Sequence, residues 1–379
     1  MTCLSFIRQI TATNFSVHKV ALNGRFTGTP QPTGTQTAAY SLFEALVREP
    51  RDCELVLFAD ERFLSVRDWA GHPGVQLIGV PFQDWSRERA HFWEQVQFPV
   101  LARRHGCRVA HHPITTSPLW HNGVKSIVTL HDLNFYRHPE WFSRAFRLVY
   151  ALCAVPGLKR AHRVVTISDY VRDQAREDFH LREDRLRMIH NGVKPLKSDA
   201  IPEGRYLLCV GSLQPHKNLA RMIKAFIRVR EDFPGLELRV VGRPQPRFTA
   251  DDELPDLLSS DGVSLLGYLS EQDLANAYAG AEIFCYPSLE EGFGLPVLEA
   301  MTLGTLVLTS NVSCLPEIAG PAMLVDPYSV EAMAQALGEL LRLPAAQRAA
   351  KVGESRAWAA KFTWSAAARG YLKIYEEVF

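Results

Sequence analysis

The sequence predicts an α/β protein with two doubly wound domains, each a parallel β-sheet covered by helices. Short runs rich in Val, Ile and Leu alternate with longer stretches of helical periodicity, which is the pattern of a parallel sheet with crossover helices. The alternation stops at residues 194–205, a polar segment with two prolines and a glycine, and then starts again. The length of 379 residues also exceeds one ordinary core, since a domain averages about 150 residues.

The first half supplies the elements of the first domain, which we expect over residues 1–197. Its helical stretches are 35–49, 89–104 and 141–154. Its strand candidates are 19–24, 53–59, 75–80, 108–113, 126–132, 163–168 and 186–193.

The second half repeats the pattern, and we expect a second domain over residues 198–360. Asn218 and Ser270 are side chains that favour a helix N-cap, and each precedes a stretch of helical period. The strand candidates are 205–212, 236–242, 262–268, 282–288 and 305–310.

Composition excludes several classes of function. Lys and Arg number 42 against 41 for Asp and Glu, so no net field would draw the chain to nucleic acid, and we expect no nucleic-acid partner. The seven cysteines are scattered through apolar runs without metal spacing, which is typical of core residues in a reducing compartment. Neither a signal peptide nor an apolar run long enough to span a membrane is recognisable, so we expect a cytoplasmic protein.

The chemistry should lie directly after strands, because ligands of doubly wound sheets bind outside the carboxyl ends. After strand 282–288, Gly292 and Gly294 permit a tight turn, Pro296 suits the first turn of a helix, and Gly304 suits its end. A helix N-terminus whose backbone amides can approach a ligand closely is a favourable binding site for a phosphate.

Two glutamates flank this helix start, Glu291 and Glu299. Carboxylates beside a phosphate are better suited to neutral hydroxyls on either side of it, and a diphosphate flanked by hydroxyls is a nucleotide sugar. The alternative is that both acids simply favour the helix N-terminus, an effect of about 0.3–1 kcal/mol. Spacing alone leaves these two interpretations open.

Three further segments are candidates for ligand contact. Lys217 precedes the Asn218 cap and would meet a phosphate there, although a solvated loop lysine is more common. His131 ends a strand and suits a substrate hydroxyl, although a structural histidine is as common. Gly34 and Thr35 lie in a Gly- and Pro-rich loop whose amides suit a ligand, or which is only a connection.

Phosphate-binding motifs of hydrolases and dehydrogenases are missing from the sequence, as is any Asp-any-Asp pair. A diphosphate would then be neutralised by Lys217, helix starts and backbone amides. We therefore expect neither a metal ion nor a cofactor.

In this order the segments closely resemble the retaining GT-B glycosyltransferases of the EX7E type, that is, glycosyltransferase family four with the group 1 glycosyl transferases. Glu291 and Glu299 have seven residues between them and resemble the EX7E signature; segments 210–226, 266–288 and 310–320 also match in place and order. The match runs over nearly the whole chain. It implies a GT-B architecture with two Rossmann-like domains facing a cleft, and a helix within 361–379 that returns to the first domain.

The resemblance also implies residue roles. Glu291 and the following amides would hold the transferred sugar, Glu299 the ribose, and Lys217 the diphosphate, while His131 would reach the reacting sugar. The catalytic residues would be His131, Lys217 and Glu291. The implied donor-binding set is Gly34, Thr35, Gly211, Ser212, His216, Lys217, Glu291, Gly292, Phe293, Gly294, Leu295 and Glu299. His216 stands where many relatives have arginine, and histidine is fully charged only when protonated, so diphosphate stabilisation would be either weaker or dependent on pH.

The implied function is retaining transfer of a hexose of the mannose, glucose or rhamnose class, without a metal ion. The donor would be a nucleoside diphosphate sugar and the acceptor a hydroxyl of a glycan or a lipid-linked oligosaccharide, in polysaccharide biosynthesis. An epimerase or hydrolase of the same fold, or a non-catalytic nucleotide-sugar sensor, is the alternative. The aromatic and basic segment 141–163 would either pack on the sheet or contact the inner face of an anionic membrane.

Overall fold

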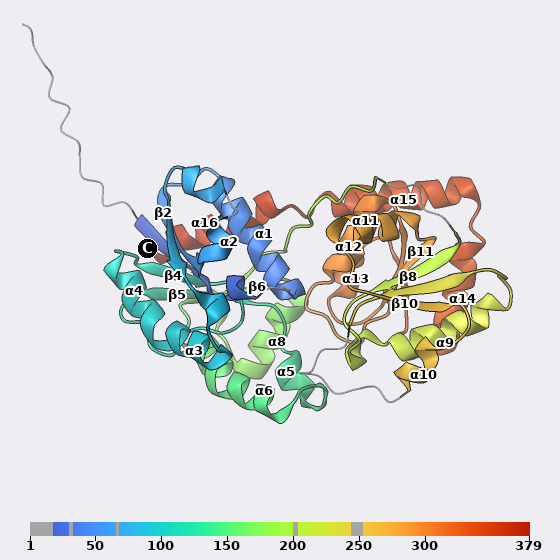
Figure 1. The fold of residues 1–379 in the computed structure, drawn as a ribbon, viewed down its shortest axis with the longest axis horizontal. Helices are drawn as coiled ribbons and strands as arrows, with labels where there is room; N and C mark the ends of the chain where they lie inside the picture. Colours follow the sequence, from blue (N-terminus) through green and yellow to red (C-terminus); the bar gives the residue numbers. More distant parts are fainter. Residues whose placement is uncertain (1–17, 30–32, 66–67, 200–203, 244–252) are drawn as a thin grey trace, which may run out of the picture.

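The computed structural model describes residues 18–29, 33–65, 68–199, 204–243 and 253–379, which form two lobes side by side (Figure 1). All strand pairs are parallel, and the sheets have the orders β3-β2-β1-β4-β5-β6-β7 and β10-β9-β8-β11-β12-β13. The strand order reverses beside β1 in one sheet and beside β8 in the other, which creates a ligand-binding switch point in each lobe. The predicted fold class is confirmed.

The first sheet contains the seven strands of the N-terminal half. They are β1 His18–Gly24, β2 Cys53–Asp60, β3 Val75–Val80, β4 Val109–His112, β5 Lys125–Leu130, β6 Arg163–Thr166 and β7 Leu186–Met188. The helical segments around it are η1 Arg25–Gly28, α1 Gly34–Arg48, α2 Glu61–Ser65, η2 Asp68–Gly71, η3 Phe82–Asp84, α3 Arg87–Phe92, η4 Trp93–Gln97, α4 Phe98–Arg104, α5 Asn134–Arg137, η5 Pro139–Trp141, α6 Arg144–Val149, η6 Tyr150–Ala154, α7 Val155–Arg160, α8 Asp169–Phe179 and η7 Glu183–Arg185.

The second sheet is built in the same way from the C-terminal half. Its strands are β8 Tyr206–Val210, β9 Glu237–Val241, β10 Val263–Gly267, β11 Ile283–Tyr286, β12 Leu306–Ser310 and β13 Met323–Val325. The helical segments of this half are η8 Pro215–Lys217, α9 Leu219–Arg230, α10 Leu254–Leu258, α11 Glu271–Gly280, α12 Leu295–Leu303, α13 Leu315–Ala319, α14 Val330–Leu341, α15 Ala345–Ala359 and α16 Trp364–Val378.

Two stretches predicted as single helices, 89–104 and 141–154, are interrupted by π-helical turns. The turns are η4 and η6, and each lies just before a proline, Pro99 in α4 and Pro156 in α7. Proline lacks the N–H that would bond to the carbonyl four residues earlier, so the hydrogen-bond register shifts in the turn before it.

Of the two predicted helix N-caps, Ser270 makes the expected side-chain hydrogen bond and Asn218 does not. Ser270 caps α11 as predicted, accepting a hydrogen bond from the Asp273 amide at 3.1 Å. Asn218 precedes α9 but makes no side-chain cap. It has a positive φ of 58°, and its side-chain amide donates instead to the carbonyls of Pro287 and Pro327, at 3.1 and 2.6 Å. Asn218 therefore occupies the predicted N-cap position, but the expected side-chain bond is missing, because its oxygen accepts from the Arg221 guanidinium at 2.9 Å instead.

The last helix, α16, packs on the first lobe although it follows the second lobe in sequence (Figure 1). The Tyr371 hydroxyl lies 2.8 Å from the Thr129 hydroxyl in β5, and the Tyr375 hydroxyl lies 2.7 Å from His111 Nδ1 in β4. The chain therefore crosses between the lobes twice, which restricts their relative movement.

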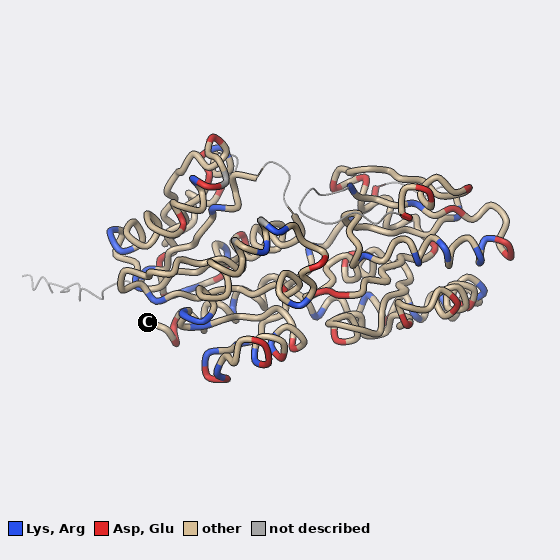
Figure 2. Tube along the Cα trace, turned by 90° about the horizontal axis from the view of Figure 1, so that it is seen from below, with Lys and Arg blue, Asp and Glu red and all other residues tan. Residues whose placement is uncertain are grey.

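Charge is mixed over both lobes. Figure 2 shows Lys and Arg interspersed with Asp and Glu along the trace, in keeping with the near-equal counts of the two signs. Within the part of the chain that the structure describes, no helix combines the length and apolar character needed to cross a membrane.

Candidate active site

A pocket of about 330 Å³ lies between the two lobes, at the carboxyl ends of their strands. The first lobe contributes the start of α1, the loops after β4 and β5, and the aromatic side of α6 and η6. The second lobe contributes the loops after β8 and β11 and the start of α12. Predicted site residues that line it are Gly34, Thr35, His131, His216, Glu291, Gly292, Phe293, Gly294 and Leu295.

The loop between β11 and α12 brings the second lobe against the first. A Cβ on Gly292 would lie 1.8 Å from the carbonyl oxygen of His131, so no other residue fits this contact without moving backbone. The Gly292 carbonyl accepts a hydrogen bond from the Ser168 hydroxyl at 2.8 Å. Gly294 has a φ of 94°, in the region that favours glycine, and directly precedes α12. The glycines thus set the position of this loop in the pocket wall.

Lys217 and Glu291 form an ion pair beside this loop. The Lys217 Nζ atom lies 2.5 Å from Glu291 Oε1 and donates to the Tyr286 hydroxyl at 2.8 Å. The side chains of Lys217 and Glu291 are only 15% and 13% exposed. Burial opposes ionisation of Glu291 and is the largest single effect. The charges of Lys217 and His216 and the hydrogen bonds from Lys217 and Ser288 together outweigh burial, so the pKa of this carboxyl is below its usual value. Glu291 therefore lines the pocket, and its cation Lys217 lies directly beside the pocket.

His131 is buried at the end of β5, and its Nε2 atom lies 2.7 Å from the Pro113 carbonyl oxygen. Because a carbonyl only accepts, Nε2 carries the proton and Nδ1 is left as an acceptor. Burial lowers the pKa of His131 to about 4, against a weaker opposing effect of the Pro113 hydrogen bond. At neutral pH this side chain is an uncharged hydrogen-bonding group on the pocket wall.

His216 is buried on the opposite side of the pocket and stacks on Trp141, with ring centroids 5.4 Å apart. Trp141 in turn stacks on His138 at 4.0 Å. The neighbouring backbone is fixed as well, since the His216 carbonyl accepts from the Leu289 amide at 2.7 Å. Packing against the aromatic ring accounts for a histidine at this position.

The remaining predicted residues lie outside this pocket. Lys217 and Gly211 line a small hollow of about 10 Å³ next to it, together with Tyr286. Ser212 lines neither space. Glu299 lies in the second turn of α12, where it accepts a hydrogen bond from the Tyr278 hydroxyl at 3.0 Å, and burial raises its pKa. The ribose-binding role of Glu299 stays a prediction.

Several pocket residues were not predicted from the sequence. Tyr286 ends β11 and bonds Lys217, and its place directly before the glycine loop is the signal that could have identified it. Phe142, Phe146 and Tyr150 form an aromatic wall with successive centroid distances of 5.1 and 4.2 Å. Their spacing of four residues predicts one face of a helix, but not that this face lines a pocket.

Glu290, for which the sequence suggests no role, joins the two lobes. Its carboxylate accepts from the Tyr170 hydroxyl at 2.9 Å and from the Gln174 amide at 3.1 Å, both in α8 of the first lobe. Burial raises the pKa of Glu290, and these two hydrogen bonds partly offset the effect. Glu290 and Glu291 are therefore adjacent acids with different partners, one at the lobe interface and one in the pocket.

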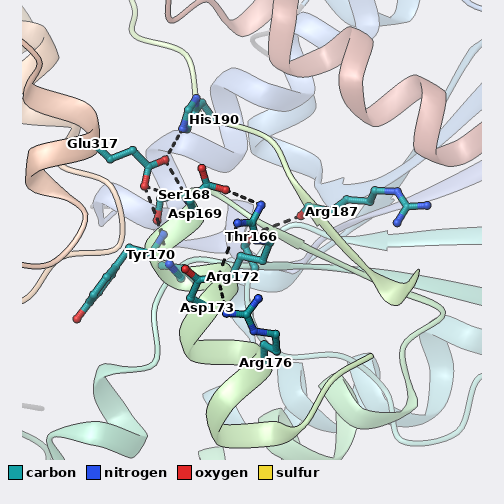
Figure 3. A network of polar contacts seen from close by, with 11 residues as sticks. Thr166, Ser168, Asp169, Tyr170, Arg172, Asp173, Arg176, Arg187, His190 and Glu317 are labelled. Atoms are coloured by element: carbon teal, nitrogen blue, oxygen red, sulfur yellow. Dashed lines mark hydrogen bonds and ion pairs between the residues drawn. The ribbon is translucent and has the colours of Figure 1, made fainter. Parts of the chain in front are cut away.

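Glu317 of α13 makes a second contact between the lobes, at the N-terminus of α8 (Figure 3). It accepts from the Asp169 amide at 3.0 Å and the Tyr170 amide at 3.3 Å. His190 Nε2 lies 2.6 Å from the same carboxylate. Burial of Glu317 raises its pKa, but these hydrogen bonds outweigh burial, so its pKa is below the usual value. A carboxylate of one lobe thus caps a helix of the other.

Replacing Glu317 with glutamine is expected to lower the free energy of unfolding by about 1–3 kcal/mol at pH 7, because charge-assisted bonds to the α8 amides are lost. A lowered folded-state pKa contributes stability above the unfolded pKa of about 4.3, and this is lost as pH falls through the folded value. The melting difference between wild type and Glu317→Gln should therefore narrow at about pH 3.5. Glu331→Gln, an exposed ion-pair residue, is the control. An equal difference at both pH values would contradict the assignment.

Comparison with known proteins agrees with this geometry. Residues 32–195 match Glycosyltransferase Family 4, and residues 195–356 match the family of Glycosyl transferases group 1. The O-antigen chain mannosyltransferase B of Escherichia coli is 31% identical over 238 residues, 56% of this chain and 60% of the relative. The MMP alpha-(1->4)-mannosyltransferase of Mycolicibacterium hassiacum is 31% identical over 291 residues, 74% of this chain and 66% of the relative. The chain thus spans less than two thirds of the length of these curated relatives.

Solved structures share the arrangement of the two lobes. Sucrose-phosphate synthase from Thermosynechococcus elongatus has a TM-score of 0.73 at 20% identity, covering 96% of this chain and 99% of that chain. Anabaena HepE in complex with UDP-glucose has a TM-score of 0.70 at 16% identity, covering 95% and 99%. At these identities the likeness concerns the fold. Together, the family matches across residues 32–356 and the two facing parallel-sheet lobes establish that the chain belongs to the GT-B glycosyltransferases of family 4 and group 1.

Proposed function

We propose that this chain transfers a hexose from a nucleoside diphosphate sugar to a hydroxyl group of an acceptor glycan, with retention at the anomeric carbon. The observation that carries the proposal is the Lys217–Glu291 pair, held beside the start of α12 on a pocket between two lobes. Relatives named as mannosyltransferases make mannose the first hexose to test, and the UDP-glucose in HepE supports a nucleotide-sugar donor.

The donor would occupy the pocket with its diphosphate at the α12 start and beside Lys217. An anion at this place gains from the positive end of the helix dipole and from the lysine charge. Lys217 would then exchange its bond with Glu291 for a phosphate oxygen, which frees the Glu291 carboxylate for hydroxyls of the hexose. The ion pair keeps both side chains in place until the donor replaces it.

In the reaction, the bond between the anomeric carbon and the leaving phosphate oxygen breaks, and the acceptor oxygen bonds to that carbon on the same face. The acceptor proton passes to the departing phosphate. Lys217 and the backbone amides stabilise the negative charge of the leaving group, the contribution that a metal ion supplies in other transferases. His131 Nδ1 accepts a hydrogen bond from the hexose and helps to orient it.

Two other functions would use the same donor site. An epimerase or hydrolase would convert the nucleotide sugar without an acceptor, and a sensor would bind it without releasing a nucleoside diphosphate. The paired Lys217 and Glu291 favour a catalytic site, since a cation beside a departing diphosphate stabilises the charge that develops in the transition state.

A thermal-shift screen of nucleotide sugars tests the donor site directly. GDP-mannose, UDP-glucose and dTDP-rhamnose should be compared with the free hexoses and free nucleotides. One nucleotide sugar is expected to raise the melting temperature more than its nucleoside diphosphate. The same ligands should change the melting temperature of the Glu291→Gln variant only slightly. Equal shifts for wild type and this variant would contradict a sugar-binding role for Glu291.

A lipid-linked acceptor is favoured by exposed apolar side chains of the first lobe. Leu148 and Leu152 are each 60% exposed and lie one turn apart on α6 and η6, opposite the aromatic residues that face the pocket.

Further exposed apolar residues of the same lobe are Phe92, Val96, Leu119 and Trp120. The η4 segment and the 117–120 loop are joined through Gln95, which bonds the Ser117 carbonyl and the Leu119 amide. Exposed arginines at 144, 147 and 160 complement an anionic surface.

Binding to anionic vesicles is therefore expected at low salt, with weaker binding at high salt because part of the attraction is electrostatic. The measurement is flotation with vesicles containing about 30% phosphatidylglycerol. The double variant Leu148→Asp, Leu152→Asp should reduce the floated fraction about tenfold. Tyr328→Asp changes an equally exposed residue of the second lobe and serves as the control. No flotation of wild type at either salt concentration removes the membrane proposal.

A further inference from the structure

The first lobe contains a buried carboxylate that the donor site does not use. Glu94 lies in the π-helical turn η4 and is fully buried. It accepts from the Asn23 side-chain amide at 2.8 Å and from the Thr116 hydroxyl at 3.1 Å. The Arg25 Nε atom lies 3.3 Å from Glu94 Oε2, the oxygen that also accepts from Thr116. A buried acid needs such partners, because an unpaired charge away from water is strongly unfavourable.

Glu94 and Thr116 hold the Arg25 side chain at the carboxyl end of β1. Besides the ion pair with Glu94, its Nη2 atom donates to the Thr116 hydroxyl at 3.2 Å. Its Nη1 atom makes no hydrogen bond to any described residue, and 14% of the side chain is exposed. A guanidinium carries five N–H groups in a fixed plane, so fixing one edge also orients the others.

Arg25, Glu94 and Thr116 lie next to residues that line the pocket between the lobes, although they do not line it themselves. Thr115, next to Thr116, lines that pocket, and so does Tyr150 of η6. Burial raises the pKa of the Cys153 thiol in the same turn, Glu94 raises it further, and Arg25 lowers it, so both charges lie close to η6. The fixed guanidinium is therefore on the first-lobe side of the pocket, away from Lys217 and α12.

We propose that Arg25 binds hydroxyl groups of a neutral acceptor glycan, and that Glu94 is a positioning residue that holds the guanidinium for this contact. The inference rests on the proposed transferase function and names the acceptor side of the same site. Glu94 matches the charge of Arg25, which suits an uncharged sugar better than a phosphate or carboxylate. The nearby histidines add no cation, because burial lowers the pKa of both. The Arg25 charge lowers the pKa of His91 further, and the charges of His111 and His121 do so for His112.

The test compares acceptor and donor behaviour of the full-length chain. Arg25→Ala is expected to raise the KM for methyl α-D-mannopyranoside, a neutral acceptor, by roughly tenfold or more, as expected for loss of hydrogen bonds from a charged group. The KM for the donor and the rate of donor hydrolysis without acceptor should stay within about twofold. Glu94→Gln keeps the size of the side chain but removes its charge, and should also raise the acceptor KM selectively. Arg62→Ala, which breaks an exposed ion pair of the same lobe, is the matched control.

A second measurement keeps the proposal testable if transfer is slow or if Arg25→Ala, which leaves the buried Glu94 without its cation, folds poorly. Saturation-transfer NMR follows binding of an oligomannoside to wild type and to Arg25→Lys, which keeps a cation beside Glu94 but lacks the planar guanidinium, with and without nucleoside diphosphate. A weaker oligomannoside signal for Arg25→Lys, with unchanged affinity for the nucleoside diphosphate, supports the assignment. Unchanged acceptor binding, equal loss of donor affinity, or no binding of neutral glycans by a wild type that binds donor would each overturn it. A wild type that binds no nucleotide sugar contradicts the proposed function, and Arg25-dependent glycan binding is then still measurable.

Discussion

Replacing Lys217 with alanine is expected to lower turnover by about 100-fold or more at saturating donor, because the variant loses the ammonium that stabilises the leaving diphosphate. The same change leaves the buried Glu291 carboxylate without its cation. Breaking a buried ion pair from one side destabilises a protein by about 3–5 kcal/mol, so a fall in activity alone would not separate catalysis from folding. Turnover must therefore be measured together with the melting temperature.

The double variant Lys217→Ala, Glu291→Gln makes this separation. Removing both charges should recover much of the stability that the single variant loses, since no unpaired charge is left. It should not recover turnover, because the leaving group still lacks its cation. Nucleoside diphosphate release under saturating donor is the readout. Normal turnover in either variant would rule out a role of Lys217 in the chemical step.

Replacing Gly292 with alanine is expected to reduce turnover by about 100-fold, although the change adds a single methyl group. A Cβ at this position would lie 1.8 Å from the His131 carbonyl oxygen, so the loop and the end of β5 must separate. That movement displaces Glu291 relative to His131, and displacement by about 1 Å is enough for an effect of this size.

Gly353→Ala is the matched control, because a Cβ at this position of α15 meets no atom within 4 Å. Removing a helix-interior glycine there should leave activity unchanged and raise stability slightly, by about 0.5–1 kcal/mol. The comparison is made on kcat and on melting temperature. If Gly292→Ala keeps wild-type kcat, close contact between the lobes at this glycine is not needed for catalysis.

Much of the fold and part of the pocket could be predicted from the sequence because local chemistry dictates them. Runs of Val, Ile and Leu become buried parallel strands wherever helices cover both faces of the sheet. The glycines at 292 and 294 and the helix after them mark a ligand loop, because few other arrangements need two glycines directly before a helix. His131 and Glu291 come together in the structure because each follows the carboxyl end of a strand.

Contacts between segments distant in sequence could not be predicted in the same way. The partners of Glu290 are Tyr170 and Gln174, and those of Glu317 are the α8 amides and His190. No spacing in the sequence links these residues. The Asn218 side chain was predicted as a cap from its type alone, but its donors bind two carbonyls of loops that only the fold brings near. The pairing of Glu94 with Arg25 is of the same kind.

The central claim, that the pocket joins a donor hexose to an acceptor, is tested most directly by product analysis. The chain is incubated with the nucleotide sugar that stabilises it most and with a neutral mannoside, and the products are followed by NMR. We expect a nucleoside diphosphate and a new glycoside with the anomeric configuration of the donor, in equal amounts. Free hexose or an epimerised sugar as the main product, or a donor that is bound but unchanged, would contradict the account.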